Sequence, residues 1–249
     1  MKKWYWLTMA VLILLSGCST AKPAADSTGL TPAQRFSLLL TQGIGDLNRK
    51  EYENAIRRLD VAVSLRPDSQ DAQNFLGIGY FMIENFKLAR RQFEKVLSLN
   101  PSHAAALSNL GSVCLKENDW DNAEGMFRRV VALTPESATS LFSLGNVLLG
   151  RGKLEEGFAY LAKAIERDPQ ILEKNQPLAT SVHENIFQNA EADFGYARLY
   201  AGLGNLEKTV EFLHRAKQAG FSDWIRIDQD PQFEKIRDLE EIRKFLESK

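Results

Sequence analysis

The stretch from Gly111 to Pro135 reads GSVCLKENDWDNAEGMFRRVVALTP, and its order of small, large and helix-ending residues recurs along the chain. Four prolines stand at intervals of 34 residues: Pro67, Pro101, Pro135 and Pro169. A glycine stands 24 residues before each proline: Gly43, Gly77, Gly111 and Gly145. Because self-similarity at a fixed period marks repeat architectures, we interpret this part of the chain as four similar units.

Three further positions agree in every unit when they are counted back from its proline. A small residue stands 12 residues earlier: Ala55, Ala89, Ala123 and Gly157. A large apolar residue stands eight residues earlier: Leu59, Phe93, Phe127 and Leu161. A small or branched apolar residue stands five residues earlier: Ala62, Val96, Val130 and Ala164. We expect the small residues to let two antiparallel helices approach, the large ones to fill the space between them, and the proline to end the second helix.

This pattern resembles the tetratricopeptide repeat over residues 36–171. The leucine that directly precedes the glycine, as in Leu76, Leu110 and Leu144, is part of it; Gln42 breaks that column in the first unit. The resemblance implies an all-α fold, a right-handed α-α superhelical solenoid of helix-turn-helix repeats, because a single unit cannot bury its own apolar face. Thr31-Pro32 is typical of a helix N-cap and first helical residue, so we expect four units over residues 31–171.

A fifth, divergent unit is expected over residues 190–219. The residues that fit its columns are Ala197, Tyr200, Gly204, Leu213 and Ala216. An insertion at 172–189 displaces this unit; it is interpreted as a loop, an extended first helix or a degenerate helix, and we favour helix from about residue 181.

Residues 220–249 are expected to form a C-terminal helical cap, because the end of a solenoid needs a polar outer face. Asp230-Pro231 predicts the start of a helix. Its apolar face would comprise Phe233, Ile236, Leu239, Ile242 and Leu246. The alternative is a docking helix for a partner.

Residues 1–17 are typical of a secretory signal. Lys2 and Lys3 precede an apolar run that is too short to span a bilayer, which takes about 20 residues. The alternative is a buried core helix, which is disfavoured because small residues and a cysteine follow at once.

The segment Leu15-Ser16-Gly17-Cys18 resembles the lipobox of bacterial lipoproteins. The resemblance implies cleavage before Cys18 and acylation of Cys18, with palmitate among the attached chains. Ser19, in place of an aspartate, implies an outer-membrane location with the body facing the periplasm, or the cell membrane in a source that has no outer membrane. Residues 18–30 are small and polar and predict a flexible, lipid-anchored tether.

The composition is that of an ordinary soluble protein and excludes several function classes. The formal net charge is −1, and after removal of the signal 29 basic residues stand against 32 acidic ones, which disfavours a nucleic-acid binder. Two cysteines are too few for a disulfide scaffold, and Cys114 is expected to be a packed thiol. His103, His183 and His214 have no partners at metal-ligand spacing. We therefore expect no metal, no cofactor, no small-molecule substrate and no enzyme activity.

The resemblance implies a concave groove lined mainly by the first helix of each unit. The family's groove positions correspond to Asn74, Ile78, Phe81, Ser108, Asn109, Ser112, Leu115, Phe142, Asn146, Leu149 and Arg198. The alternative for each is packing against the adjacent unit. Some family members clamp C-terminal carboxylates with basic residues, but those positions hold Asn74, Ser108 and Phe142 here. We therefore expect a peptide, extended or helical, that docks by apolar contacts.

The function expected from the resemblance is a non-enzymatic adaptor that is lipid-anchored to the envelope. It would assemble or recruit envelope proteins of a pilus or secretion machinery. An alternative is an adaptor that recruits peptidoglycan hydrolases or proteases, and an enzyme or small-ligand binder is the unlikely third.

Overall fold

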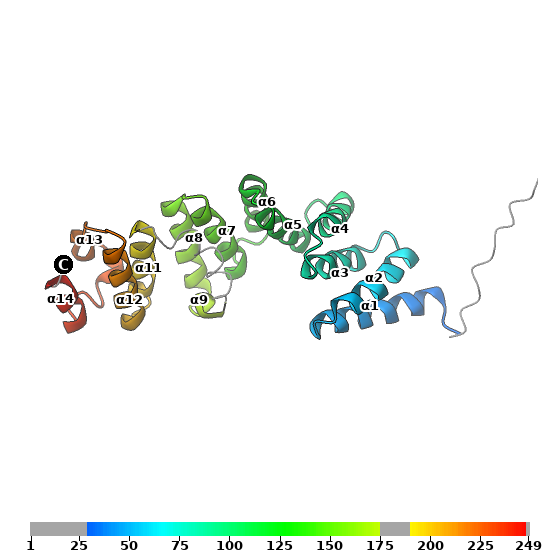
Figure 1. Cartoon of the computed structure of the whole chain (residues 1–249), viewed down its shortest axis with the longest axis horizontal. Coiled ribbons are helices and arrows are strands. Elements are labelled where there is room, and N and C mark those ends of the chain that lie inside the picture. Colours follow the sequence, from blue (N-terminus) through cyan, green and yellow to red (C-terminus); the bar gives the residue numbers. More distant parts are fainter. Residues whose placement is uncertain (1–28, 175–189, 248–249) are drawn as a thin grey trace, which may run out of the picture.

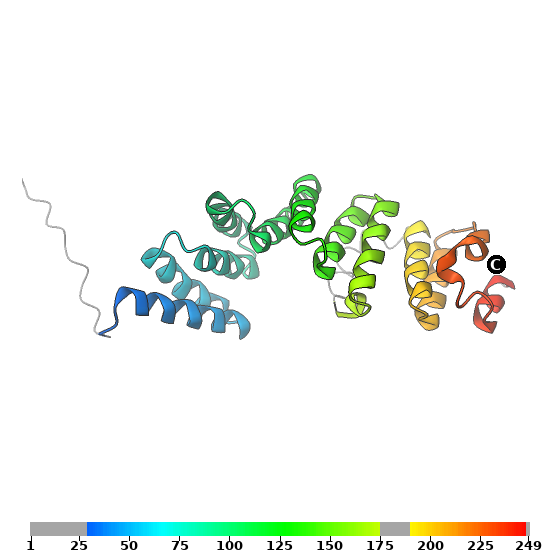
Figure 2. The same cartoon turned by 180° about the vertical axis from the view of Figure 1, so that it is seen from behind.

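The computed structural model describes residues 29–174 and 190–247, and these residues form helices joined by short turns (Figure 1). Four antiparallel pairs follow one another: α1 (Pro32–Asn48) with α2 (Tyr52–Leu65), α3 (Gln70–Met82) with α4 (Phe86–Leu99), α5 (Ala104–Lys116) with α6 (Trp120–Leu133), and α7 (Ala138–Gly150) with α8 (Leu154–Arg167). We call the first helix of each pair A and the second B. The pairs stack along the long axis of the molecule (Figure 2), which confirms the all-α solenoid.

The A helices begin where the sequence supplies a capping side chain. Ser69, His103 and Ser137 recur at the repeat interval, and each side chain accepts a hydrogen bond from the backbone N–H three residues later. Thr31 and Gln34 form a reciprocal capping box ahead of Pro32, which confirms the predicted start of α1. His103 is thus a helix cap, in which Nδ1 accepts from the Ala106 N–H at 3.1 Å.

The turn between the A and B helices needs one residue in the left-handed region. That residue recurs at the repeat interval, with φ of 63° at Lys50, 60° at Glu84, 60° at Asn118 and 74° at Gly152. At Glu84 the backbone follows a Schellman pattern, since its N–H donates to the Phe81 carbonyl and the next N–H donates to that of Tyr80. The identical turn in each pair keeps the A and B helices in the same register.

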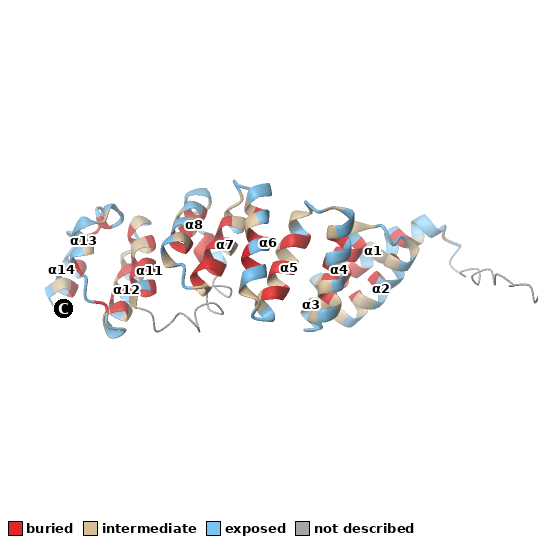
Figure 3. Cartoon of the chain, turned by 90° about the horizontal axis from the view of Figure 1, so that it is seen from above, coloured by how far each residue is buried: buried red, intermediate tan, exposed pale blue. Residues whose placement is uncertain are grey.

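The glycine column sets the distance between the helices of a pair. A Cβ placed on Gly111 would lie 2.8 Å from the Phe127 ring of α6. The other three glycines have the same close neighbour. A Cβ placed on Gly43 would lie 2.6 Å from Leu59, one on Gly77 2.5 Å from Phe93, and one on Gly145 2.9 Å from Leu161. A side chain at these positions would require the opposing leucine or phenylalanine to shift. Figure 3 shows buried residues along the helices of every pair.

The leucine column joins each pair to the one before it. Leu76 of α3 packs with Ala55 and Leu59 of α2, and Leu110 and Leu144 pack in the same way on the second and third pairs. Among the described residues no helix precedes α1, and Gln42 in that column is exposed. Within the described part of the chain, Gln42 therefore has no preceding pair to pack against, which explains its departure from the pattern.

Beyond the fourth pair, α9 (Ile171–Lys174) packs against α7 and α8. Residues 175–189 lie outside the described residues, and so does most of the predicted insertion with its expected helix from about residue 181. A fifth helix pair follows, α11 (Ala190–Gly202) with α12 (Leu206–Gln218). It stacks on α8, where the Phe158 ring meets the Tyr196 ring edge-on at 5.3 Å over Gly195.

The C-terminal segment differs from the single helix that the apolar spacing predicts. It comprises α13 (Ile225–Gln229), the short 3-10 helix η1 (Pro231–Phe233) and α14 (Glu240–Glu247), with turns between η1 and α14. Asp230 caps η1 as predicted, because its side chain accepts from the Gln232 N–H.

A cluster of aromatic rings explains why this segment turns instead of continuing as a helix. Phe233, Ile236 and Phe245 are buried in the same core as Trp224, whereas Leu239 is 40% exposed. The Phe245 ring meets the Trp224 ring edge-on at 4.8 Å, whereas the Phe233 ring lies 5.8 Å from the Phe194 ring of α11. The turns between η1 and α14 let these two residues reach different partners. None of the described helices is long and apolar enough to cross a bilayer.

We expect Gly111→Ala to destabilise the protein by about 1–3 kcal/mol, because the added methyl group overpacks against Phe127. The measurement is urea unfolding followed by circular dichroism. Gly125→Ala is the matched control: Gly125 lies in α6 with open space around its Cβ position, so alanine should stabilise the helix by about 0.5–1 kcal/mol. Equal effects of the two substitutions would contradict the close-contact role of Gly111.

Candidate partner-binding face

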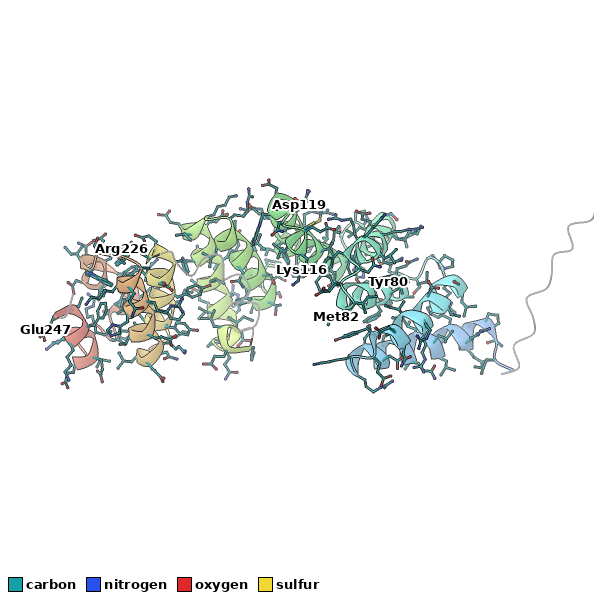
Figure 4. All side chains as sticks on the ribbon, in the orientation of Figure 1. Tyr80, Met82, Lys116, Asp119, Arg226 and Glu247 are labelled. Atoms are coloured by element: carbon teal, nitrogen blue, oxygen red, sulfur yellow. The ribbon has the colours of Figure 1, made fainter. Side chains whose placement is uncertain are left out.

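An apolar pocket of about 350 Å³ opens between the C-terminal ends of α1 and α3. Its lining residues are Ile44, Leu47, Asn48, Lys50, Tyr52, Phe75, Ile78 and Met82. Of the predicted groove residues, Ile78 lies in this pocket. Met82, at the end of α3 (Figure 4), is 44% exposed, and the other apolar lining residues are half-buried. We call this site the Ile78 pocket.

The Ile78 pocket is built by the repeat itself. Ile44 and Ile78 occupy the same position in successive A helices, one repeat interval apart, and Leu47 lies one turn further along α1. Lys50 stands at the rim in the left-handed turn, and no hydrogen bond or ion pair to its ammonium group is recorded among the described residues. The arrangement offers an open hydrocarbon surface with one cation at its edge.

The predicted polar residues of α3 and α5 lie next to one another. The Asn109 Nδ2 donates to the Asn74 Oδ1 at 3.1 Å, and the Ser112 hydroxyl donates to the Ser108 carbonyl at 3.1 Å. Asn74 is only 7% exposed. The two amides therefore tie neighbouring A helices together, and the two serines are half-buried beside them.

Two other predicted groove residues, Phe81 and Leu115, are partly buried against neighbouring side chains. Phe81 is half-buried and meets the Phe86 ring edge-on at 5.5 Å, so it faces the B helix of its own pair. Leu115 is likewise half-buried and packs beside the core formed by the third and fourth pairs. Each of the two side chains keeps some exposed surface, so a groove role for Phe81 and Leu115 stays a prediction.

The fourth unit departs most from the predicted groove. Phe142 and Leu149 are each 1% exposed and belong to the core that also holds Ile171 of α9 and Phe158 of α8. The groove positions Phe142 and Leu149 of α7 are therefore core positions in this structure, and Leu149 packs against Gly157 of α8. Asn146 is buried as well, and its Oδ1 has no hydrogen-bond partner among the described residues.

Arg198 of α11 forms an ion pair with Asp230, the residue that caps η1. This pair fastens the C-terminal segment to the fifth helix pair. The sequence analysis did not predict this ion pair. Asp230 stands 32 positions further along the chain, and it reaches Arg198 only because the C-terminal segment turns back.

Glu124 is a buried carboxylate that is surrounded by cationic side chains. Glu124 lies in α6 and is buried where this helix faces the end of α7 and the start of α8. Burial opposes its charged form, but hydrogen bonds from Lys153, Arg128 and Arg151 outweigh that cost and lower the pKa of Glu124 to about 2. Lys153 Nζ lies 2.9 Å from both carboxylate oxygens. The cluster is an ion-pair clamp between the third and fourth pairs.

Cys114 is buried as predicted, and burial raises the pKa of its thiol. His214 packs edge-on against the Phe245 ring at 5.1 Å, and His183 lies outside the described residues. Within residues 29–174 and 190–247, no three His, Cys, Asp or Glu side chains gather where they would hold a metal ion.

Comparisons with known proteins agree with this architecture. The family model described as tetratricopeptide repeat matches residues 79–129 and 115–170. The solved structure of MamA, residues 41 to the end, from Desulfovibrio magneticus RS-1 is 21% identical, covers 76% of this chain and 97% of that chain, and has a TM-score of 0.54. A crystal structure of MamA is 20% identical, with 71% and 93% covered and a TM-score of 0.50. No curated protein matches the sequence. At these identities the likeness shows the fold.

We expect Glu124→Gln to lower the free energy of unfolding by about 3 kcal/mol at neutral pH, because three cations lose their shared carboxylate. The contribution of Glu124 is complete above its ordinary pKa of 4.5 and is lost as the pH falls toward 2, since the lowered pKa belongs to the folded state. Urea unfolding of both proteins across this range should show the difference shrinking. Glu155→Gln, at an exposed position in α8, is the control; a pH-independent difference for Glu124→Gln would contradict the clamp.

Proposed function

Since the central units of this chain carry tetratricopeptide repeats, we propose that it is a non-enzymatic adaptor that binds peptide segments of envelope proteins. The observation that carries the proposal is the Ile78 pocket, an apolar recess open on the face of the A helices. Its volume and hydrocarbon lining suit one bulky apolar side chain of a partner peptide. Of the buried ionisable groups described above, Glu124 joins the third and fourth pairs through ion pairs and Cys114 lies in the core.

The proposal places the adaptor at a membrane. Its support is the sequence Leu15-Ser16-Gly17-Cys18, with residues 1–17 as the signal and Cys18 as the lipidated residue. Several acyl chains give stable anchoring, because each buried CH₂ contributes about 0.8 kcal/mol. With Ser19 after the cysteine, we assign the body to the periplasmic face of an outer membrane, where it recruits components of a pilus or secretion machinery.

We expect Ile78→Asp to weaken partner binding tenfold or more, because burying one apolar side chain is worth about 1.5–3 kcal/mol. A photo-crosslinking amino acid at Phe75, which lines the Ile78 pocket, would capture the partner in intact cells. The cross-linked segment is then identified, synthesised and titrated against wild type and Ile78→Asp.

The control for this experiment is Ile83→Asp. Ile83 is an exposed apolar residue just after α3 and is not among those that line the pocket. Its substitution should leave the affinity for the peptide unchanged. Equal loss with both variants, or none with Ile78→Asp, would move the binding site away from the Ile78 pocket.

We expect Cys18→Ser to move the protein from the membrane to the soluble fraction and to abolish incorporation of labelled palmitate. The chain has one other cysteine, Cys114, which is buried in the core. Cys114→Ser is therefore the control and should retain both the label and the membrane fraction. Palmitate incorporation in Cys18→Ser would show that the lipid is attached elsewhere.

A further inference from the structure

Lys50 is the one charged residue among those that line the Ile78 pocket. The rest of the lining consists of five apolar side chains and the uncharged polar side chains of Asn48 and Tyr52. Lys50 is exposed, and within the described residues no hydrogen bond or ion pair of its ammonium group is recorded. A partner side chain that enters the pocket therefore meets hydrocarbon with a free cation at its edge.

Two carboxylates close to Lys50 along the chain already have partners. Asp46 accepts a hydrogen bond from Arg58 at 2.6 Å and also pairs with Arg49. Glu51 accepts from Arg49 at 3.2 Å and from the Asn54 side chain at 3.2 Å. The acids on both sides of this turn are thus held by other side chains, and the charge of Lys50 is left for a partner.

Two further acids near these turns have no recorded ion pair in the described part of the chain, and neither lines the pocket. Glu53 lies in the first turn of α2. Glu84 stands at the left-handed position of the second pair, which Lys50 occupies in the first. The turn after α1 therefore presents a positive charge at the pocket, and the turn after α3 a negative charge beside it. An acidic group of a partner is attracted toward the first turn and repelled from the second.

Building on the proposed function, we propose that the Ile78 pocket selects partner segments that carry an acidic side chain beside the bulky apolar one. The apolar side chain fills the recess between α1 and α3. The neighbouring carboxylate pairs with the Lys50 ammonium group over the turn after α1. The charge adds specificity and orientation to a site whose affinity comes from the burial of hydrocarbon.

The occupant is a peptide with an internal acidic side chain. A chain-end carboxylate is typically held by several converging backbone N–H groups, whereas the pocket lining offers one ammonium group. A fatty acid also joins hydrocarbon to a carboxylate, but small-ligand sites bury most of the ligand surface. This recess is open, with Met82 44% exposed (Figure 4). A peptide gains further contacts along the A helices, which an isolated fatty acid does not.

The test is selection from a phage library of random heptapeptides that are displayed without a free carboxyl end. Wild-type protein should enrich sequences in which an aspartate or glutamate stands beside a bulky apolar residue. Lys50→Glu should enrich a lysine or arginine there instead, because the charge at the rim is reversed. Lys95→Glu is the matched control: Lys95 is exposed on α4 and does not line the pocket, so the same change in net charge should leave the selected pattern unchanged.

The affinity of one selected peptide then measures the ion pair. The peptide is labelled with fluorescein and prepared in two forms, one with the acidic residue and one with the corresponding amide. Lys50→Gln should weaken binding of the acidic form about two- to fivefold, the strength of an exposed ion pair, and leave binding of the amide form unchanged. The difference between the two forms should shrink at high salt, since salt screens exposed charges.

The outcomes separate this inference from the proposed function. Selection of no bulky apolar residue, or the same selection by Ile78→Asp, would overturn both. Bulky apolar residues without an acid, or a preference for an acid that persists with Lys50→Glu, would overturn this inference alone. Loss of binding when the carboxyl end of the synthetic peptide is amidated would move the carboxylate to the chain end. Binding of laurate without selection of any peptide would assign the pocket to a fatty acid and overturn both.

Discussion

The contact between a glycine on each A helix and a large apolar side chain on the B helix of the same pair is the constraint on which the solenoid depends. At Gly43, Gly77, Gly111 and Gly145 there is no room for a methyl group. Each pair is therefore held at one separation, and pairs of equal thickness can stack in a regular row. The leucine before each glycine then reaches the preceding pair, so adjacent positions on one helix make the contact within a pair and the contact between pairs.

Periodicity predicts most of this architecture because every repeat needs the same residue types at the same positions to pack. The helix pairs, the cap at Thr31 and the burial of Cys114 follow from residue type and spacing alone. Single-copy features do not repeat, so spacing carries no signal for them. Phe142 shares its core with Ile171 of α9, Arg198 pairs with Asp230, and Phe245 packs against Trp224. Each is a tertiary effect of a segment that occurs once.

The two glutamines that replace a leucine of the repeat, Gln42 and Gln73, differ in their surroundings. Gln42 replaces a leucine at the exposed end of the stack, where an apolar side chain would face solvent. Gln73 replaces a leucine inside the stack, where it is buried and keeps an unpaired carbonyl. Both departures are visible in the sequence once the columns are aligned. Burial distinguishes the two positions: Gln42 is exposed and Gln73 is buried.

The left-handed turn residues make the repeats energetically unequal despite their common geometry. Gly152 and Gly204 adopt this conformation freely, whereas Lys50 and Glu84 hold it against a steric cost of about 1–2 kcal/mol each, and Asn118 tolerates it better. Because each repeat of a solenoid contacts only its neighbours, the steric cost of a turn residue destabilises mainly its own pair. The first two pairs therefore carry a backbone cost that the fourth and fifth pairs do not. Replacing Lys50 or Glu84 with glycine would remove that cost from one pair without altering the packing of the others.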